Sequence, residues 1–496
     1  MINKSTFQNH KITVMLFFLL FTLTVNAQIG IGTTTPNVSS VLDVNSTTKG
    51  LLTPRMTTSQ RLAITTPADG LMVYDIDLQL FYYYSTSAAT WLSVTNGAQG
   101  RINFKRIKST DVLATVLATE LAAGGGSKYL LSSNTLYEIN GTVTFNFPID
   151  LNNAYLRGVD VNEDKIVRNS GNIFEGANGG SIKDMTLTAS NGNVFNLSGT
   201  PTQNLIFRDC IVSSSNSVGT ISGFGLVFCS IIQFSGNTNG ITYNNITQLL
   251  LSNIGWFSNN LGTYEKLTGT FTLVEKQGGF SHINGTAIGF DVSANPVITS
   301  DAVLESVVFS GTNTGGYVKP YTSGNFIGYN FDNNWSVRSS GIPTETDANA
   351  AGDFSMDYAV GTGISVPFTN NLNPSNIVKV GDAGTISTYT NLFRFSTDAP
   401  NRLKYVGKKK RIFNIVGSIS FQVPAVGIYI IYIAKNGAIL NQYKIYGRGT
   451  ITSDIIVLPI NATAELVNGE YIEVYAQRYS GSNGNIVVPN MTVTIR

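Results

Sequence analysis

A six-residue pattern recurs along the middle of the chain. Its six copies are IKDMTL from Ile182, FRDCIV from Phe207, FCSIIQ from Phe228, LSNIGW from Leu251, FSHING from Phe280 and LESVVF from Leu304. The first position is always apolar, and the third is polar in every copy: Asp184, Asp209, Ser230, Asn253, His282 and Ser306. The third positions follow each other at intervals of roughly 21 to 29 residues, a period typical of solenoid repeats. Each copy is therefore predicted to lie on one turn of a solenoid.

The turns of this solenoid are predicted to consist of strands. The repeats contain short β-branched and aromatic runs between Gly, Asn and Ser clusters, without a long stretch of 3.6-residue periodicity. The second position is mostly polar, so residues alternate between inward and outward, and the third residue falls where the chain bends. We expect the third-position residues to form a structural ladder that hydrogen-bonds the corner backbone. Further strand-like runs recur at a similar interval, which predicts a parallel β-helix.

The amino-terminal residues have the features of an export signal. Lys4 and Lys11 are followed by an apolar run from Ile12 to Val25 and a small-residue cleavage site at Ala27. The run is too short to span a bilayer comfortably. Residues 1–27 are therefore predicted to be a signal peptide, and the mature chain is expected on the extracellular surface, without a transmembrane segment.

Composition excludes several classes of function. Only 12% of residues are charged, and basic and acidic residues nearly balance, so net charge gives no argument for nucleic acid as a partner. Two cysteines exclude a cysteine-rich scaffold or zinc site. The repeat pattern points Cys210 inward and Cys229 outward, which predicts that they are unpaired. No cofactor is expected.

The N-terminal half outside the repeats divides into two segments. Residues 28–95 contain short strands and turns broken by prolines, and are predicted to be a β-rich assembly or attachment module. Residues 96–128 are predicted to be a linker or short helical neck, because residues 111–123 suit a helix that ends at three glycines.

The β-helix is predicted for residues 129–341, with a connector at 342–352. From 353 to 496 the strand-like runs lengthen, and Asn436-Gly437 between apolar runs is a hairpin signal. Such a row of long antiparallel strands is predicted to close as a sandwich. The predicted fold class is all-β: a right-handed parallel β-helix followed by an antiparallel jelly-roll sandwich, with a small β-rich N-terminal module.

Three segments resemble known families. G-I-G-T-x-x-P, L-D-V, K-G-x-L-x-P-R-M-T and G-x-x-V-Y-D occur in this order between residues 29 and 94, which resembles an N-terminal module of exported bacterial surface and fibre proteins. YLLSSNTLYEINGTVTF and AYLRGVDV resemble the first coils of pectin-lyase-like β-helices, including bacteriophage tail spikes and fibres. RLKYVGKKKRIFNIVGSISF and V-N-G-E-Y-I-E-V-Y-A resemble the jelly-roll heads of phage fibres, which are similar to trimeric complement-globular and tumour-necrosis-factor heads. The resemblance implies a homotrimer.

Few residues are suited to catalysis. His282 is the only histidine outside the predicted signal peptide, which excludes a multi-histidine metal site, and its ladder position predicts a structural role. Paired carboxylates remain, because β-helix spikes that cleave polysaccharide use paired acids on the coil surface. Asp160, Glu163 and Asp164 are weak catalytic candidates, with a solvated loop as the alternative. No metal site is predicted.

Binding residues are expected at the start of the C-terminal domain. Six cations lie within ten positions: Arg402, Lys404, Lys408, Lys409, Lys410 and Arg411. They are candidates for contact with an anionic surface glycan, and a solvated turn is the alternative. Five aromatic residues are candidates for stacking on sugar rings, with core or inter-subunit packing as the alternative: Trp256, Phe257, Tyr317, Tyr321 and Trp335.

The sequence thus predicts an exported, non-enzymatic fibre or adhesin. It is expected to bind a cell-surface carbohydrate or protein receptor through its β-helix shaft and C-terminal head. A virion fibre is the alternative location, and a β-helix polysaccharide lyase or glycoside hydrolase is the alternative function. A cleft of clustered acids across adjacent coils would favour the enzyme.

Overall fold

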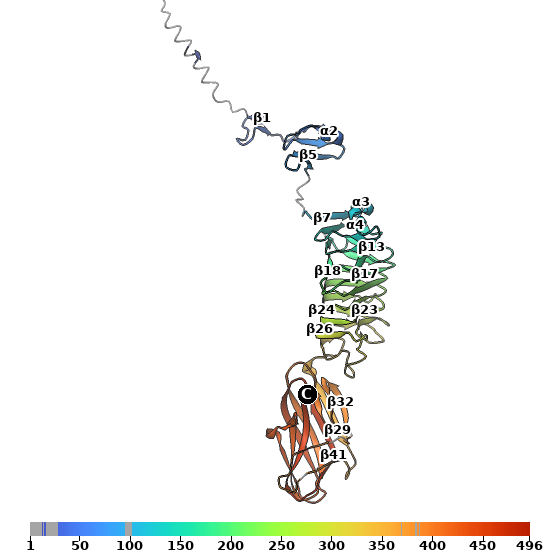
Figure 1. Cartoon of the computed structure of the whole chain (residues 1–496), viewed down its shortest axis with the longest axis vertical. Helices are drawn as coiled ribbons and strands as arrows, with labels where there is room; N and C mark the ends of the chain where they lie inside the picture. Colours follow the sequence, from blue (N-terminus) through green and yellow to red (C-terminus); the bar gives the residue numbers. More distant parts are fainter. Residues whose placement is uncertain are drawn as a thin grey trace, which may run out of the picture. The chain divides into compact units, whose positions relative to one another are not determined.

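The computed structural model describes residues 28–94, 102–368, 370–381, 384–385 and 387–496, together with residues 12, 14 and 15. The chain forms two compact units, Met1–Ile102 and Asn103–Arg496 (Figure 1). The rest of the predicted signal peptide lies outside the described residues. Within the described part of the chain, no helix has the length and apolar character needed to cross a membrane.

The first unit contains two small sheets. In one, β1 (Ile29–Ile31) pairs in parallel with β2 (Leu42–Val44). The other has the order β3 (Arg55–Met56), β4 (Met72–Asp75), β5 (Leu80–Ser85) and β6 (Thr90–Ser93). The short helix α2 (Thr58–Leu62) begins at a capping box formed by Thr57 and Gln60.

The second unit begins with a parallel β-helix (Figure 1). The 13-stranded sheet contains β7 (Phe104–Lys108), β9 (Leu136–Asn140), β10 (Thr142–Thr144), β12 (Tyr155–Arg157), β13 (Lys165–Arg168), β15 (Gly180–Lys183), β16 (Thr186–Ala189), β18 (Asn204–Ser213), β20 (Leu226–Ser235), β22 (Gln248–Trp256), β24 (Thr270–His282), β26 (Val297–Ser310) and β28 (Trp335–Ser340). The 9-stranded sheet contains β8 (Tyr129–Leu130), β11 (Ile149–Asp150), β14 (Phe174–Gly176), β17 (Asn193–Ser198), β19 (Ser217–Ser222), β21 (Ile241–Asn244), β23 (Thr263–Thr268), β25 (Ile288–Asp291) and β27 (Val318–Lys319). One continuous core of aliphatic and aromatic side chains fills the space between the sheets.

The β-helix begins earlier than the sequence predicted. β7 pairs in parallel with β9, so part of the segment expected to be a linker or neck is the first strand of the solenoid. The helix expected at 111–123 is present as α3 (Leu113–Val116) and α4 (Ala118–Ala123). Leu113 and Leu117 from this helical segment join the solenoid core, so the helices cover its first coil.

The corner ladder exists, but two of its six predicted members are wrong. Pairing between coils places Ile231 opposite Asp209 and Gly278 opposite Asn253, in the positions expected for Ser230 and His282. The residues at this corner share a left-handed backbone, with φ of 57° at Asp184, 55° at Asp209, 55° at Ile231, 52° at Asn253, 68° at Gly278 and 58° at Ser306. Asp, Asn and Gly tolerate this conformation better than most residues, which explains the polar ladder.

The two errors have one cause. In these two copies the six-residue pattern assigns the inward first position to an aromatic residue, Phe228 or Phe280. Phe207 in fact pairs with Cys229, and Leu251 pairs with Lys276, so a cysteine and a lysine occupy the inward column. Cys229 is therefore buried and not outward as predicted, and both cysteines are free, as predicted.

The inward Lys276 forms an ion pair inside the solenoid. Its ammonium lies 2.8 Å from the Glu265 carboxylate, and the two side chains are 0% and 1% exposed. The contact lacks the geometry of a hydrogen bond, so neither charged group is fully satisfied. Each charge consequently depends on the other, because a single buried charge in an apolar core is very unfavourable.

The C-terminal head, from β29 onward, has two antiparallel sheets around one core, as predicted for this region. The 6-stranded sheet contains β29 (Ala351–Asp357), β30 (Ile364–Val366), β32 (Thr388–Phe393), β35 (Arg411–Gln422), β39 (Ile455–Leu466) and β41 (Ile486–Ile495). The 7-stranded sheet contains β31 (Val378–Lys379), β33 (Phe395–Ser396), β34 (Leu403–Tyr405), β36 (Gly427–Lys435), β37 (Ala438–Ile439), β38 (Ile445–Gly449) and β40 (Tyr471–Gly481). The 3-10 helix η1 (Asp347–Asn349) directly precedes β29, and the 3-10 helix η2 (Asn441–Tyr443) lies between β37 and β38. Asn436 and Gly437 have positive φ in the β36–β37 hairpin, as that turn requires.

A buried arginine connects the head to the last coil of the solenoid through hydrogen bonds. Arg394, between β32 and β33, is 1% exposed. Its guanidinium donates hydrogen bonds to the backbone oxygens of Trp335 at 2.6 Å and Glu345 at 3.3 Å, and to the side chain of Asn333. Because these acceptors belong to the end of the solenoid and the following connector, they fix the position of the head's first strands.

Glu345 completes this junction with an unusual carboxylate. It is 0% exposed and accepts hydrogen bonds from the backbone N–H groups of Asn330 at 2.7 Å and Phe331 at 3.0 Å. Burial raises the pKa of Glu345 to about 7, and those hydrogen bonds and the charge of Arg394 oppose this only in part. The folded junction therefore holds a proton that the unfolded chain releases at lower pH.

We predict that Lys276→Met lowers the free energy of unfolding by about 3–5 kcal/mol, because it leaves the Glu265 carboxylate without a counter-charge. The double variant Lys276→Met, Glu265→Leu should recover most of this loss. The control is Arg338→Met, which breaks the exposed Arg338–Glu305 pair and should cost at most about 1 kcal/mol. Denaturant unfolding followed by circular dichroism measures all three. An effect of Lys276→Met no larger than that of the control would contradict the prediction.

We also predict that Glu345 makes the protein less stable as pH rises from about 4.5, the ordinary pKa of a glutamate, to about 7. The sign follows because the folded state binds more protons than the unfolded state in this window. The contribution is about 1.4 kcal/mol per pH unit at most, and Glu345→Gln should remove it. Denaturant unfolding of both proteins at several pH values measures the difference in slope. Identical slopes would show that Glu345 titrates normally.

Candidate functional site

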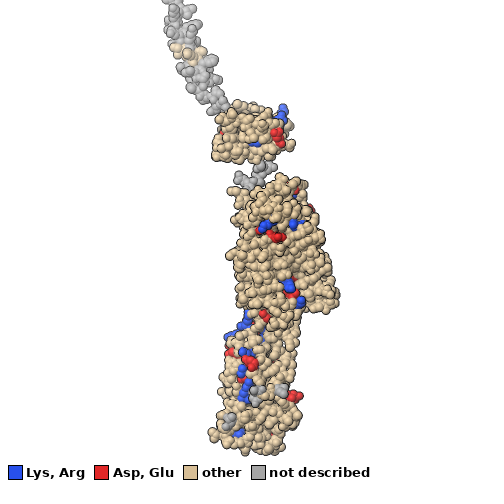
Figure 2. All heavy atoms as spheres, turned by 45° about the vertical axis from the view of Figure 1, so that its right-hand side comes forward, with Lys and Arg blue, Asp and Glu red and all other residues tan. Residues whose placement is uncertain are grey.

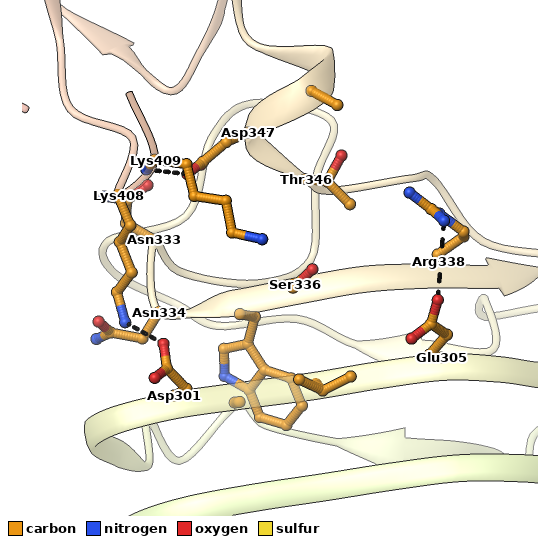
Figure 3. A pocket seen from close by; sticks show the side chains of 14 residues that line it. Asp301, Glu305, Asn333, Asn334, Ser336, Arg338, Thr346, Asp347, Lys408 and Lys409 are labelled. Atoms are coloured by element: carbon orange, nitrogen blue, oxygen red, sulfur yellow. Dashed lines mark hydrogen bonds and ion pairs between the residues drawn. The ribbon is translucent and has the colours of Figure 1, made fainter. Parts of the chain in front are cut away.

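A pocket of about 560 Å³ lies where the solenoid meets the head (Figure 3). Its floor comes from the last long strands of the solenoid, β26 and β28, and its walls from η1 and from the loop between β34 and β35. Residues from three parts of the sequence thus converge: 301–305, 333–348 and 408–409. The Arg394 junction described above sets their relative positions.

Acidic and basic side chains are balanced in this pocket. The Lys408 ammonium donates hydrogen bonds to Asp301 at 3.0 Å and to the backbone oxygen of Ser300 at 2.6 Å. The hydrogen bond from Lys408 lowers the pKa of Asp301 below its usual value, against a smaller opposite effect of burial. Arg338 lies 3.8 Å from Glu305.

Lys409 is the exception among these charges. Its backbone N–H donates to Asp347 at 2.7 Å, which orients the residue. Its ammonium has no ion pair or hydrogen bond to the described residues, and Figure 3 shows the side chain extending into the pocket beside Ser336 and Thr346. The pocket therefore offers one unpaired cation among hydroxyl, amide and carboxylate groups.

The rest of the predicted cation cluster is engaged within the chain. Arg402 donates to Glu473 at 2.9 Å and to Asp398 at 3.1 Å, and its guanidinium lies 3.8 Å from the centre of the Tyr471 ring. Lys404 also contacts Asp398, at 3.1 Å. Lys410 pairs with Glu465 at 3.2 Å, and Arg411 donates to the backbone oxygen of Asp347. On the face drawn in Figure 2, basic and acidic side chains likewise occur in small mixed groups.

Most of the aromatic residues proposed for sugar stacking are buried. Trp256, Tyr321 and Trp335 are 1%, 3% and 2% exposed. Trp335 lies under the pocket, where its indole N–H donates to the Tyr321 hydroxyl at 3.0 Å, and Trp256 stacks on Phe234 in the core. Their faces are covered by the solenoid core, which excludes stacking on a ligand. Phe257, at 41%, is an exposed member of the set.

The weak catalytic candidates form a loop between β12 and β13. The Asp164 carboxylate accepts hydrogen bonds from the backbone N–H groups of Gly141 at 2.7 Å, Val159 at 2.6 Å and Asp160 at 2.9 Å. Burial alone would raise the pKa of Asp164, but these hydrogen bonds together lower it below its usual value. Asp160 accepts from the backbone of Asn162, and Glu163 is exposed. Asp164 therefore organises the loop backbone.

A different pair of acids lies on adjacent coils. Asp184 and Asp209 are neighbours in the corner ladder, and both line a hollow of about 290 Å³. Lys183 lies between them, 3.8 Å from Asp184 and 3.6 Å from Asp209. Arg157 donates to Asp184 at 3.0 Å, and Arg208 donates to Asp209 at 3.3 Å. This group has the acidic and basic composition that the loop of Asp164 lacks.

The acids of the junction pocket, Asp301 and Glu305, are arranged differently. They are four residues apart on β26, and each lies close to its own basic side chain: Asp301 is 3.0 Å from Lys408, and Glu305 is 3.8 Å from Arg338. Among the described residues, no cluster of three or more His, Cys, Asp or Glu side chains is suited to hold a metal.

A second ladder, at another corner, was missed in the sequence. Asn237 and Asn260 are each 1% exposed and follow Ser215 on successive coils. The Asn237 side chain accepts from the backbone of Ser215 at 3.1 Å, and the Asn260 side chain accepts from the backbone of Asn237 at 3.0 Å. This ladder satisfies buried corner backbone, the role predicted for the ladder of Asp184. Its signal in the sequence is a small or polar pair, Ser214-Ser215, Gly236-Asn237 and Asn259-Asn260, that recurs after 22 and 23 residues.

Residues 30–110 match a family model described as a phage tail like trimerisation region. The match covers most of the described first unit and extends through β7, the first strand of the solenoid. No curated protein matches the chain. Together with the parallel β-helix, the family match confirms the predicted resemblance to phage tail-spike proteins.

Among solved structures, the chain is similar to the enzymatically active domain of tailspike protein 4 of bacteriophage CBA120. The two are 9% identical, and the alignment covers 90% of this chain and 77% of that one. The TM-score is 0.21, so this likeness carries no argument about fold or function.

Proposed function

We propose that the protein is a homotrimeric, phage-tail-like fibre with a jelly-roll head, which binds a carbohydrate or protein receptor on a cell surface. The match of residues 30–110 to a trimerisation region carries this proposal, because the same residues lead into the first strand of a long β-helix. Exposed apolar side chains in the first unit support it: Val38, Val41 and Leu52 are 91%, 77% and 77% exposed. Contact between three chains would cover such surface. A virion or an extracellular surface is the proposed location.

The junction pocket is the proposed receptor site. It offers hydroxyl and amide groups and one unpaired ammonium, that of Lys409, above paired charges that keep the site polar. These groups suit a polyhydroxylated ligand that carries an acidic group, as acidic surface glycans do. Because shaft and head both line the pocket, such a ligand would contact both.

We further propose that receptor binding occurs without cleavage. The engagement of the Asp164 carboxylate with three backbone N–H groups supports this.

A polysaccharide lyase or hydrolase is the second candidate function. The specific observation in its favour is the pair Asp184 and Asp209, whose Cα atoms on adjacent coils are about 4.8 Å apart and which are surrounded by Arg157, Lys183 and Arg208. A carboxylate close to basic side chains is the composition of a lyase groove. The hollow beside these residues is small, about 290 Å³, which favours the binding function.

The mass of the mature chain in solution tests the assembly. We expect light scattering coupled to size exclusion to give the mass of three chains for residues 28–496, because residues 30–110 match a trimerisation region. Dilution should not change the mass over the range that can be measured. A monomer would refute the fibre proposal and make the enzyme the leading candidate.

The receptor site is tested with an acidic surface polysaccharide. We expect Lys409→Glu to weaken binding at least tenfold, because it replaces the unpaired cation by a carboxylate that repels the acidic ligand. Lys410→Glu is the matched control, since Lys410 lies outside the pocket and pairs with Glu465. Binding is measured by interferometry on immobilised polysaccharide, and product length by gel filtration. Shortening of the polysaccharide that is lost in Asp184→Asn would establish the enzyme instead.

A further inference from the structure

Two exposed tyrosines lie next to each other on the face of the 7-stranded sheet that points away from the core of the head. Tyr446 on β38 and Tyr479 on β40 are 52% and 46% exposed, and their rings meet edge to face with centroids 6.3 Å apart. Tyr155, in the solenoid, is comparably exposed at 48%, whereas the other tyrosines of the chain are buried or half-buried. Two adjacent exposed rings on a rigid sheet offer a large contact area at low cost in conformational entropy.

The packing of β38 directs Tyr446 outward. The next residue, Gly447, faces the core, where a Cβ atom would lie 3.0 Å from a methyl group of Ile456 and 3.1 Å from one of Leu458. Glycine therefore lets this strand lie directly on β39, and its position sets which residues of β38 face inward. Because side chains alternate along a strand, Tyr446 points to the opposite face.

A β-bulge directs Tyr479 to the same face. Arg478 and Ser480 pair with successive residues of β36, so Tyr479 is an extra residue without a partner in that strand. Arg478 is 1% exposed, and its guanidinium donates a hydrogen bond to the backbone oxygen of Asn370 at 3.0 Å, which anchors the bulge. Bulges reorient single side chains and are frequent at functional sites, and this one brings the ring of Tyr479 against that of Tyr446.

Two unpaired cations flank Tyr446. Lys444 and Arg448 lie two residues before and after it, so the three side chains share one face, with steps of about 7 Å between neighbours. The Lys444 ammonium lies 5.8 Å from the centre of the Tyr446 ring. The ion pairs among the described residues of the head use other cations. The acid that follows this strand, Asp454, accepts hydrogen bonds from Thr450. The surface is therefore aromatic and positively charged.

We propose that Lys444, Tyr446, Arg448 and Tyr479, the tyrosine platform, bind a sugar residue of an acidic glycan. The apolar face of a pyranose ring packs on the tyrosine rings, while Arg448 binds the carboxylate through its planar fork and Lys444 adds a second positive charge. The inference rests on the proposed receptor function and adds a contact on the head itself, because the junction pocket is lined by none of these residues.

Charge distinguishes a glycan from a second copy of the chain as the occupant. If the platform met the same surface of another copy, Lys444 and Arg448 would face like charges, which is unfavourable in an interface. An acidic glycan neutralises both cations and uses the rings. A neutral glycan would leave both charges without a partner.

Binding of the full mature chain to immobilised polygalacturonate tests the platform. We expect Tyr446→Ala and Arg448→Glu each to weaken binding at least fivefold, and added salt to narrow the effect of Arg448→Glu more than that of Tyr446→Ala. Tyr446→Phe keeps the ring and should bind like the wild type. The matched control is Tyr155→Ala, which removes a tyrosine of similar exposure outside the platform. No binding by the wild type, or unchanged binding by Tyr446→Ala, would overturn the proposal.

Nitration by tetranitromethane gives a second readout that needs no variant. The reagent modifies exposed tyrosines, and mass spectrometry of peptides locates them. We expect saturating polygalacturonate to slow nitration of Tyr446 and Tyr479 at least fivefold and to leave Tyr155 unaffected. Resistance of Tyr446 and Tyr479 to nitration in the ligand-free protein would show that another copy covers the platform, and would overturn the proposal.

The Lys409→Glu variant separates this inference from the proposed receptor site. Loss of binding in Lys409→Glu but not in Tyr446→Ala would leave the junction pocket standing and overturn the platform. Loss in Tyr446→Ala but not in Lys409→Glu would support the platform and move the receptor site from the pocket to the head. Loss in both variants would support two contacts with one ligand.

Discussion

Parallel backbone pairing between successive coils determines the rest of the second unit. From β7 to β28, each strand hydrogen-bonds the equivalent strand of the next coil, so a residue in one coil has a fixed neighbour above and below. Columns of equivalent positions follow from this register: an inward column, an outward column and a corner column. The core of the solenoid and its corner ladder are properties of these columns, because a single coil cannot bury its own side chains.

The inward column shows how strongly the register outweighs residue type. Lys276 is paired with Leu251 and Leu304, and the pairing holds its side chain in the core although its charge disfavours that place. The fold accommodates it through Glu265 on the other sheet, whose column otherwise contains Ile241 and Phe290. Lys276 and Glu265 lie on different sheets and in different columns, so they become partners only when the coil closes.

The register between coils also explains which parts of the fold can be predicted from the sequence. The period, the strand texture and the alternating polarity were sufficient to predict the β-helix and most of its corner ladder. The errors at Phe228 and Phe280 arose because an apolar first position was assumed, whereas backbone pairing admits Cys229 and Lys276 there. A one-residue shift in a strand turns every side chain to the other face, which is why the pattern predicts an outward Cys229.

The junction pocket could not be predicted in the same way. Lys408 and Asp301 are 107 residues apart in the chain, and their contact depends on how the head is fastened to the last coil. The six cations were visible in the sequence, but their partners Asp301, Asp398, Glu465 and Glu473 were not. A cluster of like charges predicts an anion site only if the charges are unpaired. Among these six cations, the ammonium of Lys409 is the one without a partner among the described residues.

The corner ladder shows what the construction of the solenoid requires of one residue in each coil. A left-handed residue is required at this corner in each coil, and a polar or glycine residue there meets that requirement at low strain. Ile231 meets it at higher strain and in return places an apolar side chain on the flank, beside ion-paired Asp184 and Asp209.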